Sequence, residues 1–290
     1  MVDLIKLGLQ LSILLTVLGM GLAASWADVT YLLRKPGLLA RSFLSMFILM
    51  PIICVCVALY FHLPPAIKVG LVALAISPVP PFLPKKELMV GGQEAYTISL
   101  LSLAAALSIL FVPVVSSLLG QWFDLPAEIS ALKVAQIVGV TILAPLLVGI
   151  AVRAWMPALA AKAAIPAGVI GLALLVVCLI PVVIRLWPLI SSFFGDGTVL
   201  TLALIALVGT AAGHFLGGPD FRERTVLALS TSARHPAVAI TVATSAFPEG
   251  KLALGAVLLY VLVVTVVTVP YVLWSKGRGF GLPPQARNVR

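Results

Sequence analysis

Two short stretches of the sequence carry the side chains whose types and spacing could do chemistry. The first has four prolines among positions 78–84, directly before Lys85 and Lys86. The second has three hydroxyl residues at 230–232, and Arg234 follows them closely. Ammonium and guanidinium groups bind carboxylates and other anions through charge-assisted hydrogen bonds. The two stretches are therefore a candidate anion-binding site.

The composition places both stretches in an integral membrane protein. Of the 290 residues, 61% are hydrophobic and 10% are charged, and the mean hydropathy is +1.18. A soluble domain carries about 25% charged residues. Because a bilayer core needs about 20 apolar residues per helix, this length allows a helical bundle in the lipid bilayer and almost no soluble domain. We expect no nucleic-acid partner, since the basic residues behind the net charge of +9 lie mostly in predicted loops. We expect no enzyme, because the sequence has no Gly-rich phosphate loop, nucleophile elbow, paired-carboxylate arrangement or HExxH pattern.

Hydropathy and the positions of Pro and Gly predict nine transmembrane helices in an all-α fold. Their bounds are 4–27, 39–61, 66–90, 94–119, 129–154, 164–187, 197–217, 223–246 and 251–275. Of the 19 Lys and Arg residues, eleven fall on one predicted side of the membrane and five on the other. Cytoplasmic loops carry the excess of basic residues. We therefore expect a multi-pass protein of the cell (inner) membrane, with its N-terminus outside and a cytoplasmic tail at 276–290.

The three remaining basic residues lie inside predicted helices, in the third and the eighth. A proline inside a helix removes a hydrogen bond and clashes with the preceding turn, so both helices should be broken. Irregular backbone is tolerated at membrane depth only where it is buried in protein or lines a cavity, so the two breaks should meet in the interior. Helices five apart run in opposite directions, which is typical of an inverted-repeat transporter. We expect a single transporter domain over 1–290, with repeats at 1–119 and 129–275.

The chain resembles the bile acid:sodium symporter (BASS) family along nearly its whole length. The stretches that carry the resemblance are Leu18-Gly19-Met20-Gly21-Leu22, Leu32-Leu33-Arg34-Lys35-Pro36, Met50-Pro51, Ser77-Pro78, Gly91-Gly92-Gln93 and Arg224-Thr225-Val226-Leu227-Ala228-Leu229. The resemblance implies a panel domain and a core domain built from ten helices, with two unwound helices crossing at the substrate and sodium sites. It also implies that this chain begins at the second of those helices, so that the first helix of the first repeat is missing.

The chain departs from the family at the two breaks. Sodium-coupled members have Gly-Gly-Thr-x-Ser-Asn at the first break, where this chain has 79–84, Val-Pro-Pro-Phe-Leu-Pro. They have a Glu and then Gln-Asn at the second break, where this chain has Ser230 and then Arg234 and His235. A permanently protonated guanidinium would repel sodium. The sequence therefore predicts a sodium-independent secondary transporter of an organic anion, bile-acid-like or another carboxylate, in which fixed cations replace the sodium ions.

The candidate substrate-binding residues lie in or beside the two breaks. They are Ser77, Pro84, Lys85, Lys86, Thr97, Ser230, Ser232, Arg234 and His235. We expect no cofactor and no metal site, because the three cysteines, at 54, 56 and 178, lie in apolar runs and are interpreted as core residues.

Other interpretations of these residues stay open at this point. Arg234 could serve only to hold the broken helix, and the triplet at 85–87 could be a solvated turn. His235 could cap the break or titrate near neutral pH. Glu94 is interpreted as an interfacial residue.

The alternative functions are a sodium-coupled anion symporter with relocated ion sites and a membrane sensor that binds an anion without transporting it. A hydrolytic dyad of Ser77 and Lys85 is a weaker alternative, because it leaves the second break unexplained.

Overall fold

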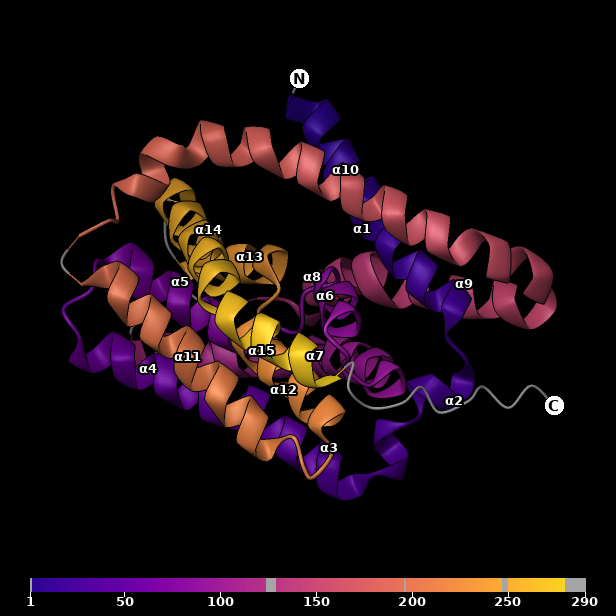
Figure 1. The fold of residues 1–290 in the computed structure, drawn as a ribbon. Coiled ribbons are helices and arrows are strands. Elements are labelled where there is room, and N and C mark those ends of the chain that lie inside the picture. Colours follow the sequence, from indigo (N-terminus) through magenta and orange to yellow (C-terminus); the bar gives the residue numbers. More distant parts are fainter. Residues whose placement is uncertain (1, 124–128, 196, 247–249, 280–290) are drawn as a thin grey trace.

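The computed structural model describes residues 2–123, 129–195, 197–246 and 250–279, and the regular secondary structure in these ranges is helical throughout (Figure 1). This confirms the all-α prediction. The α-helices are α1 (Val2–Ala23), α2 (Trp26–Val29), α3 (Pro36–Phe43), α4 (Met50–Tyr60), α5 (Pro65–Ile76), α6 (Leu83–Met89), α7 (Glu94–Phe123), α8 (Ala131–Val138), α9 (Ala144–Trp155), α10 (Pro157–Ser191), α11 (Thr198–Leu216), α12 (Phe221–Ser232), α13 (Pro236–Ala246), α14 (Gly250–Val267) and α15 (Val269–Gly279). A 3-10 helix, η1 (Leu32–Arg34), and two π-helices, η2 (Leu44–Leu49) and η3 (Gly139–Leu143), join some of them.

Six helical segments of the described chain are long and apolar enough to cross a membrane, as a multi-pass membrane protein requires. They are Pro36–Tyr60, Glu94–Gln121, Ala131–Trp155, Pro157–Ser191, Thr198–Leu216 and Leu254–Arg278. Leu7–Ala23 and Pro65–Ile76 are shorter apolar helices. The count of nine spans, the inverted repeat and the positions of the termini stay predictions. The predicted tail begins inside α15, and its residues 280–290 lie outside the described part of the chain.

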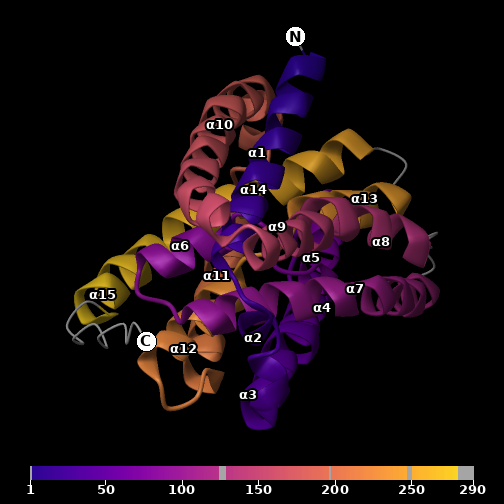
Figure 2. The same ribbon diagram turned by 90° about the vertical axis from the view of Figure 1, so that its right-hand side faces the viewer.

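Three helices, α1, α9 and α10, pack on one another and form what we call the three-helix layer (Figures 1 and 2). Glycines let their backbones come together. A Cβ added to Gly19 of α1 would lie 2.8 Å from the backbone nitrogen of Gly168 in α10, and one on Gly149 of α9 would lie 2.6 Å from the carbonyl carbon of Gly21. Small residues at such contacts allow the close approach on which helix association in membranes depends.

The helices α3 to α7 and α11 to α15 form what we call the helical body. Within it α11 packs on α12 and α14, and both α13 and α14 pack on α5. Large side chains that are fully buried, such as Tyr96, Tyr260, Met46 and Met50, fill its interior. Figure 2 shows α1 and α10 toward one end of the molecule, α9 near its middle and α3 at the other end. The division of the molecule into a panel domain and a core domain stays a prediction.

Two helices of the body are interrupted at the predicted positions. The first interruption runs from Ser77, which has extended backbone angles of φ −78° and ψ 150°, to the start of α6 at Leu83. The second runs from Ala233, at φ −91° and ψ 141°, to α13, which starts at Pro236. Proline is tolerated in the first turn of a helix because that position needs no amide donor. The prolines therefore end one helix and begin the next.

The cysteines depart from the prediction at one position. Cys54 and Cys178 are buried, but Cys56 is exposed. The interpretation of all three as core residues was therefore wrong for Cys56. Residues two apart on an α-helix project about 200° apart, so Cys54 and Cys56 cannot share the buried face of α4.

Candidate functional site

The backbones of the two interruptions are joined directly. The amide of His235 in the second interruption donates a hydrogen bond of 2.8 Å to the carbonyl oxygen of Pro78 in the first. Breaking a helix frees amide and carbonyl groups, and buried groups of this kind need partners. Each interruption thus supplies a partner for the other. We call this meeting point the crossover.

Arg234 is buried at the crossover, with 2% of its surface exposed. Its Nη1 donates to the carbonyl oxygen of Ser77 at 3.3 Å, and its Nη2 donates to that of Met46 at 3.0 Å. Its Nε has no hydrogen-bond partner. Among the described residues, no carboxylate lies within ion-pair distance of the guanidinium. Backbone carbonyl dipoles are therefore the groups that balance its charge.

The carbonyl of Met46 comes from the π-helix η2. The wider turn of a π-helix changes the hydrogen bonding of a helix locally, and such turns are frequent at functional sites. The guanidinium of Arg234 thus links three segments of the body, namely the two interruptions and η2.

Most of the other polar side chains at the crossover already have hydrogen-bond partners in neighbouring parts of the chain. The hydroxyl of Ser77 donates to the carbonyl of Ala73 at 2.7 Å, and that of Ser232 donates to the carbonyl of Leu229 at 3.1 Å. Nε2 of His235 lies 3.4 Å from the hydroxyl of Thr141, while its Nδ1 has no partner. The hydroxyls of Ser77 and Ser232 are therefore occupied by backbone carbonyls of their own helices.

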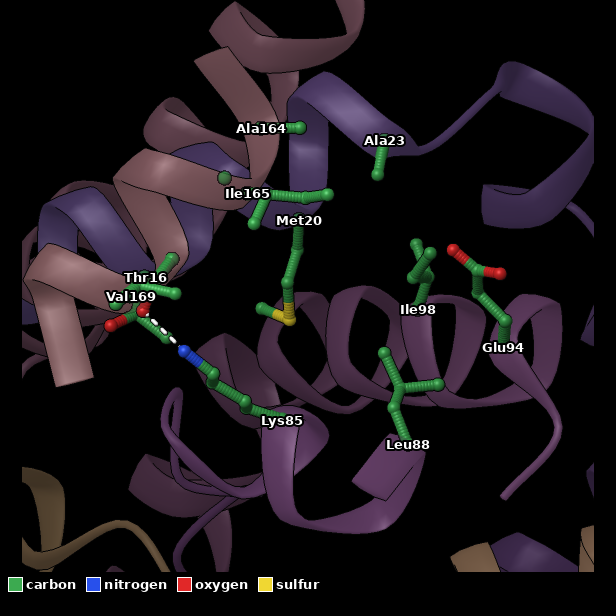
Figure 3. Close-up of a pocket in the computed structure, with 12 residues that line it drawn as sticks. Thr16, Met20, Ala23, Lys85, Leu88, Glu94, Ile98, Ala164, Ile165 and Val169 are labelled. Carbon is green, nitrogen blue, oxygen red and sulfur yellow. Dashed lines mark hydrogen bonds between the residues drawn. The ribbon is translucent and has the colours of Figure 1, made fainter. Parts of the chain in front are cut away.

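A cavity of about 230 Å³ lies between the three-helix layer and the helical body (Figure 3). Its lining is mostly apolar. The layer contributes Thr16, Gly19, Met20, Ala23, Ala164, Ile165, Gly168 and Val169, and the body contributes Lys85, Leu88, Glu94 and Ile98. Lys85 and Glu94 lie toward opposite ends of the cavity in Figure 3. The cavity therefore offers one basic and one acidic group on an apolar surface.

The two lysines of the first stretch point to different places. Nζ of Lys85 donates across the cavity to the carbonyl oxygen of Gly168 in α10 at 2.5 Å (Figure 3). Nζ of Lys86 donates to the hydroxyl of Thr268, between α14 and α15, at 2.9 Å. Neighbouring residues on a helix project 100° apart, which separates the two side chains. Lys85 lines the cavity, and the partly buried Lys86 bonds to another segment of the body.

A carboxyl group that the sequence analysis did not select lies on the other side of α6. Glu87 is 1% exposed, and its Oε1 accepts a hydrogen bond of 2.6 Å from the hydroxyl of Ser230. The buried Thr97 side chain interacts with the same carboxyl group, but Thr97 Oγ1 and Glu87 Oε2 lack a hydrogen bond of normal geometry. The interpretation of 85–87 as a solvated turn was therefore wrong for Glu87.

The nine candidate residues thus do not form one cluster. Ser77, Arg234 and His235 meet at the crossover, Ser230 and Thr97 surround Glu87, and Lys85 lines the cavity. Pro84 is buried in the first turn of α6, while Lys86 and Ser232 bond inside the body. The role of each residue in binding stays a prediction.

A polar cluster lies at one end of the body, at the edge of the eighth predicted span and in the segment before the second. Glu223, at the start of α12, accepts hydrogen bonds from Lys35 Nζ at 2.6 Å and from the Tyr31 hydroxyl at 2.7 Å. The pKa of Lys35 is raised above its usual value, mainly because its ammonium group donates a hydrogen bond to Glu223. The Lys35 side chain is 46% exposed, so this is a surface ion pair tying α12 to the segment between α1 and α3.

These features define a class of protein: an α-helical multi-pass membrane protein with two broken helices that meet beside a buried arginine. A family model described as Sodium Bile acid symporter family matches residues 10–193. The chain belongs to this family, as its sequence motifs predicted, and membership indicates a membrane transporter of the bile acid symporter type. The matched residues include the first interruption and α6, whereas the second interruption lies beyond them. No curated protein matches the chain.

Proposed function

We propose that this protein is a secondary transporter that moves an organic anion, bile-acid-like or another carboxylate, across the cell membrane without sodium. The substrate occupies the cavity between the three-helix layer and the helical body. Arg234 holds a permanent positive charge at the crossover. The two parts of the molecule move relative to each other to open the cavity on alternate sides.

The observation that carries this proposal is the environment of Arg234. Its guanidinium is buried, bonds to two backbone carbonyls, and has no carboxylate within ion-pair distance in the described chain. A sodium ion about 4 Å from it would be repelled by about 4 kcal/mol at the effective dielectric constant usual for proteins. A sodium ion at the crossover would need oxygen ligands, and the carbonyl oxygens of Ser77 and Met46 already accept hydrogen bonds from Arg234. This supports sodium independence.

Lys85 supports an anionic substrate. Its ammonium group points into a mostly apolar cavity and donates to a single carbonyl, that of Gly168. An ammonium group has three donors and no acceptor, so a carboxylate could replace or join this carbonyl. Apolar walls with a few placed polar groups are typical of small-molecule sites. The lining therefore suits a carboxylate with an apolar body.

The size of the cavity supports alternating access. Its volume of about 230 Å³ lies below the roughly 300–1,000 Å³ usual for ligand pockets. A steroid-sized anion thus requires the layer and the body to separate. The hydrogen bond from Lys85 to Gly168 joins these two parts and would break in that movement. A substrate carboxylate would supply Lys85 with a new acceptor at that moment.

Uptake of radiolabelled organic anions into proteoliposomes, with sodium replaced by choline, tests the proposal. The purified full-length chain is assayed with cholate, pantoate and a keto acid. We expect at least one anion to be taken up or exchanged at the same rate in both media. Strong dependence on sodium would favour a symporter with relocated ion sites. Binding of an anion without uptake or exchange would favour a sensor.

The matched variants are Arg234→Met and Arg185→Gln. Each removes one guanidinium, but Arg185 is exposed on α10 and is far in sequence from both interruptions. We expect uptake to be lost in the first variant and kept in the second. Equal uptake in both would remove the support that Arg234 gives to the proposal.

A further inference from the structure

Glu87 is a buried carboxyl group without an ion pair. Among the described residues, Glu87 and Glu223 are the buried acidic side chains, at 1% and 4% exposure. Glu223 is paired with Lys35 at 2.6 Å, whereas no basic group lies within ion-pair distance of Glu87. A carboxylate buried without a cation is so costly that the group takes up a proton instead. The burial of Glu87 therefore favours its neutral form.

The hydrogen bonding around Glu87 fits a carboxylic acid. Oε1 accepts from the hydroxyl of Ser230, as the carbonyl oxygen of an acid would. Oε2 has no partner of normal geometry, and neither has the hydroxyl oxygen of Thr97, which interacts with the same carboxyl group. A proton on Oε2 would make it a donor and Thr97 Oγ1 its acceptor. Thr97 could also donate to a carboxylate oxygen, so this pair accommodates the neutral acid, and the lack of a neighbouring cation is what favours it.

The charged and titratable groups around Glu87 are occupied elsewhere. On α6 itself, Lys86 donates to Thr268. On α7, the Tyr96 hydroxyl pairs with Ser42, and Glu94 lies at the cavity. On α12, Glu223 is two turns away from Ser230 and is held by Lys35. None of these groups supplies Glu87 with a compensating charge at contact distance.

The position of Glu87 connects this proton to the substrate cavity. Lys85 and Leu88 lie three residues apart on α6 and line the cavity, while Glu87 points to α12 on the other side of the same helix. Helix α6 has seven residues and carries both groups. Separation of the layer from the body would therefore change the surroundings of the one short helix that carries both Lys85 and Glu87.

We infer that Glu87 is the proton-binding site of this transporter, and that Thr97 and Ser230 stabilise its protonated form. A proton from water on one side binds Oε2, giving a neutral acid that stays buried with the substrate bound. The same proton returns to water on the other side. This inference rests on the proposed function, because it names the coupling ion of that transport. Glu87 thus takes the proton-binding role that the sequence analysis had left open for His235.

A spectroscopic experiment tests proton binding without any substrate. Infrared spectra of the full-length protein in liposomes are recorded across a pH titration, and the C=O stretching band of a protonated carboxylic acid is followed. We expect a band that disappears at high pH in the natural protein and is absent in Glu87→Gln. The matched control Asp220→Asn neutralises an exposed carboxylate that caps α12, and should keep the band. A band that persists in Glu87→Gln, or none in the natural protein, would overturn the inference.

A transport experiment separates this inference from the proposed function. Radiolabelled cholate is supplied to proteoliposomes with an inward proton gradient, or for exchange without a gradient, and protein-free liposomes give the background. Glutamine can accept from Ser230 and donate to Thr97, so Glu87→Gln mimics the protonated acid and should fold. We expect it to keep exchange but to lose accumulation driven by the gradient, at least tenfold. Accumulation equal to that of the natural protein would refute the role of Glu87 alone. Failure of the natural protein to exchange any anion would refute the proposed function, and the infrared band would still decide whether Glu87 binds a proton.

Discussion

Arg234 and Lys85 are two basic side chains that bond to backbone carbonyls, yet they have very different surroundings. Arg234 is 2% exposed, and both of its acceptors, Ser77 and Met46, belong to the helical body. Lys85 is partly exposed, and its acceptor, Gly168, belongs to the three-helix layer across the cavity. Arg234 links segments within the helical body, whereas Lys85 links the helical body to the three-helix layer.

The different surroundings of Arg234 and Lys85 suit their positive charges to different functions. The carbonyls around Arg234 belong to η2 and the first interruption within the packed body, so under the proposed function its charge would keep its place. The single hydrogen bond of Lys85 would be exchangeable, because the separation of layer and body that we propose would break it. A fixed charge suits the replacement of a bound ion, whereas an exchangeable one suits the recognition of a substrate.

The largest effect should come from Arg234→Met. It leaves the carbonyls of Ser77 and Met46 without their donor, which costs roughly 1–3 kcal/mol for each buried acceptor. Release of the buried charge offsets part of this cost. We expect the free energy of unfolding to fall by about 2 kcal/mol, measured by chemical denaturation in detergent, and anion uptake to fall to background. Unchanged uptake would show that transport does not need the fixed charge of Arg234, and the contrast with Lys85 would no longer hold.

Lys85→Gln should weaken substrate binding with little loss of stability. A hydrogen bond to a charged group contributes about 1.5–3 kcal/mol, which corresponds to roughly a ten- to hundredfold rise in KM. The melting temperature should change little, because the lysine makes one hydrogen bond at a cavity wall. Lys86→Gln makes the same chemical change on a side chain that bonds to Thr268. If this second variant raised the KM as much as the first, charge alone rather than position in the cavity would explain the effect.

Tyr260→Phe tests how tightly the crossover is held. The Tyr260 hydroxyl donates to the carbonyl of Ser232 at 2.8 Å, at the end of α12. Its removal should lower the free energy of unfolding by about 1 kcal/mol, the usual contribution of one hydrogen bond. The KM should stay constant, because Tyr260 does not line the cavity. A raised KM in thermally stable protein would mean that the crossover and the cavity act as one site.

The smallest effect should come from Lys35→Met, which removes a third basic side chain. Its ion pair with Glu223 is partly solvated, and such pairs contribute less than about 1 kcal/mol. Because Glu223 raises the pKa of Lys35, the contribution is complete below the ordinary lysine pKa of about 10.4 and is lost as the pH rises further. Thermal unfolding of the natural protein and the variant, compared from neutral to alkaline pH, should therefore converge at high pH. A difference that grew with pH would contradict this sign.

The sequence predicted an all-helical chain and the two positions where helices break, because hydropathy and proline act locally. It also singled out Arg234, since an arginine inside an apolar segment is rare. It could not separate Lys85 from Lys86, because their different surroundings depend on the 100° between neighbouring residues and on which helices pack on each face of α6. Nor did it reveal η2, whose carbonyl holds Arg234.

Glu87 was missed although the sequence holds a signal for it. Of the ten acidic residues, it is the one that lies inside a predicted membrane segment away from its first position. Because it directly follows two lysines, the sequence also allowed the triplet at 85–87 to be a solvated turn. The structure shows that the lysines bond elsewhere, and that contact with Ser230, 143 residues away in sequence, decides its surroundings.

The glycine contacts of α1 have a mechanical consequence. Where main chains touch without intervening side chains, as at Gly19 with Gly168 and at Gly21 with Gly149, there is no rotamer that can relax to let the helices slide. We therefore expect α1, α9 and α10 to move as one rigid unit. If this unit tilts, the backbone has to bend where the chain leaves it, for example at the non-helical link of Ala24 and Ser25.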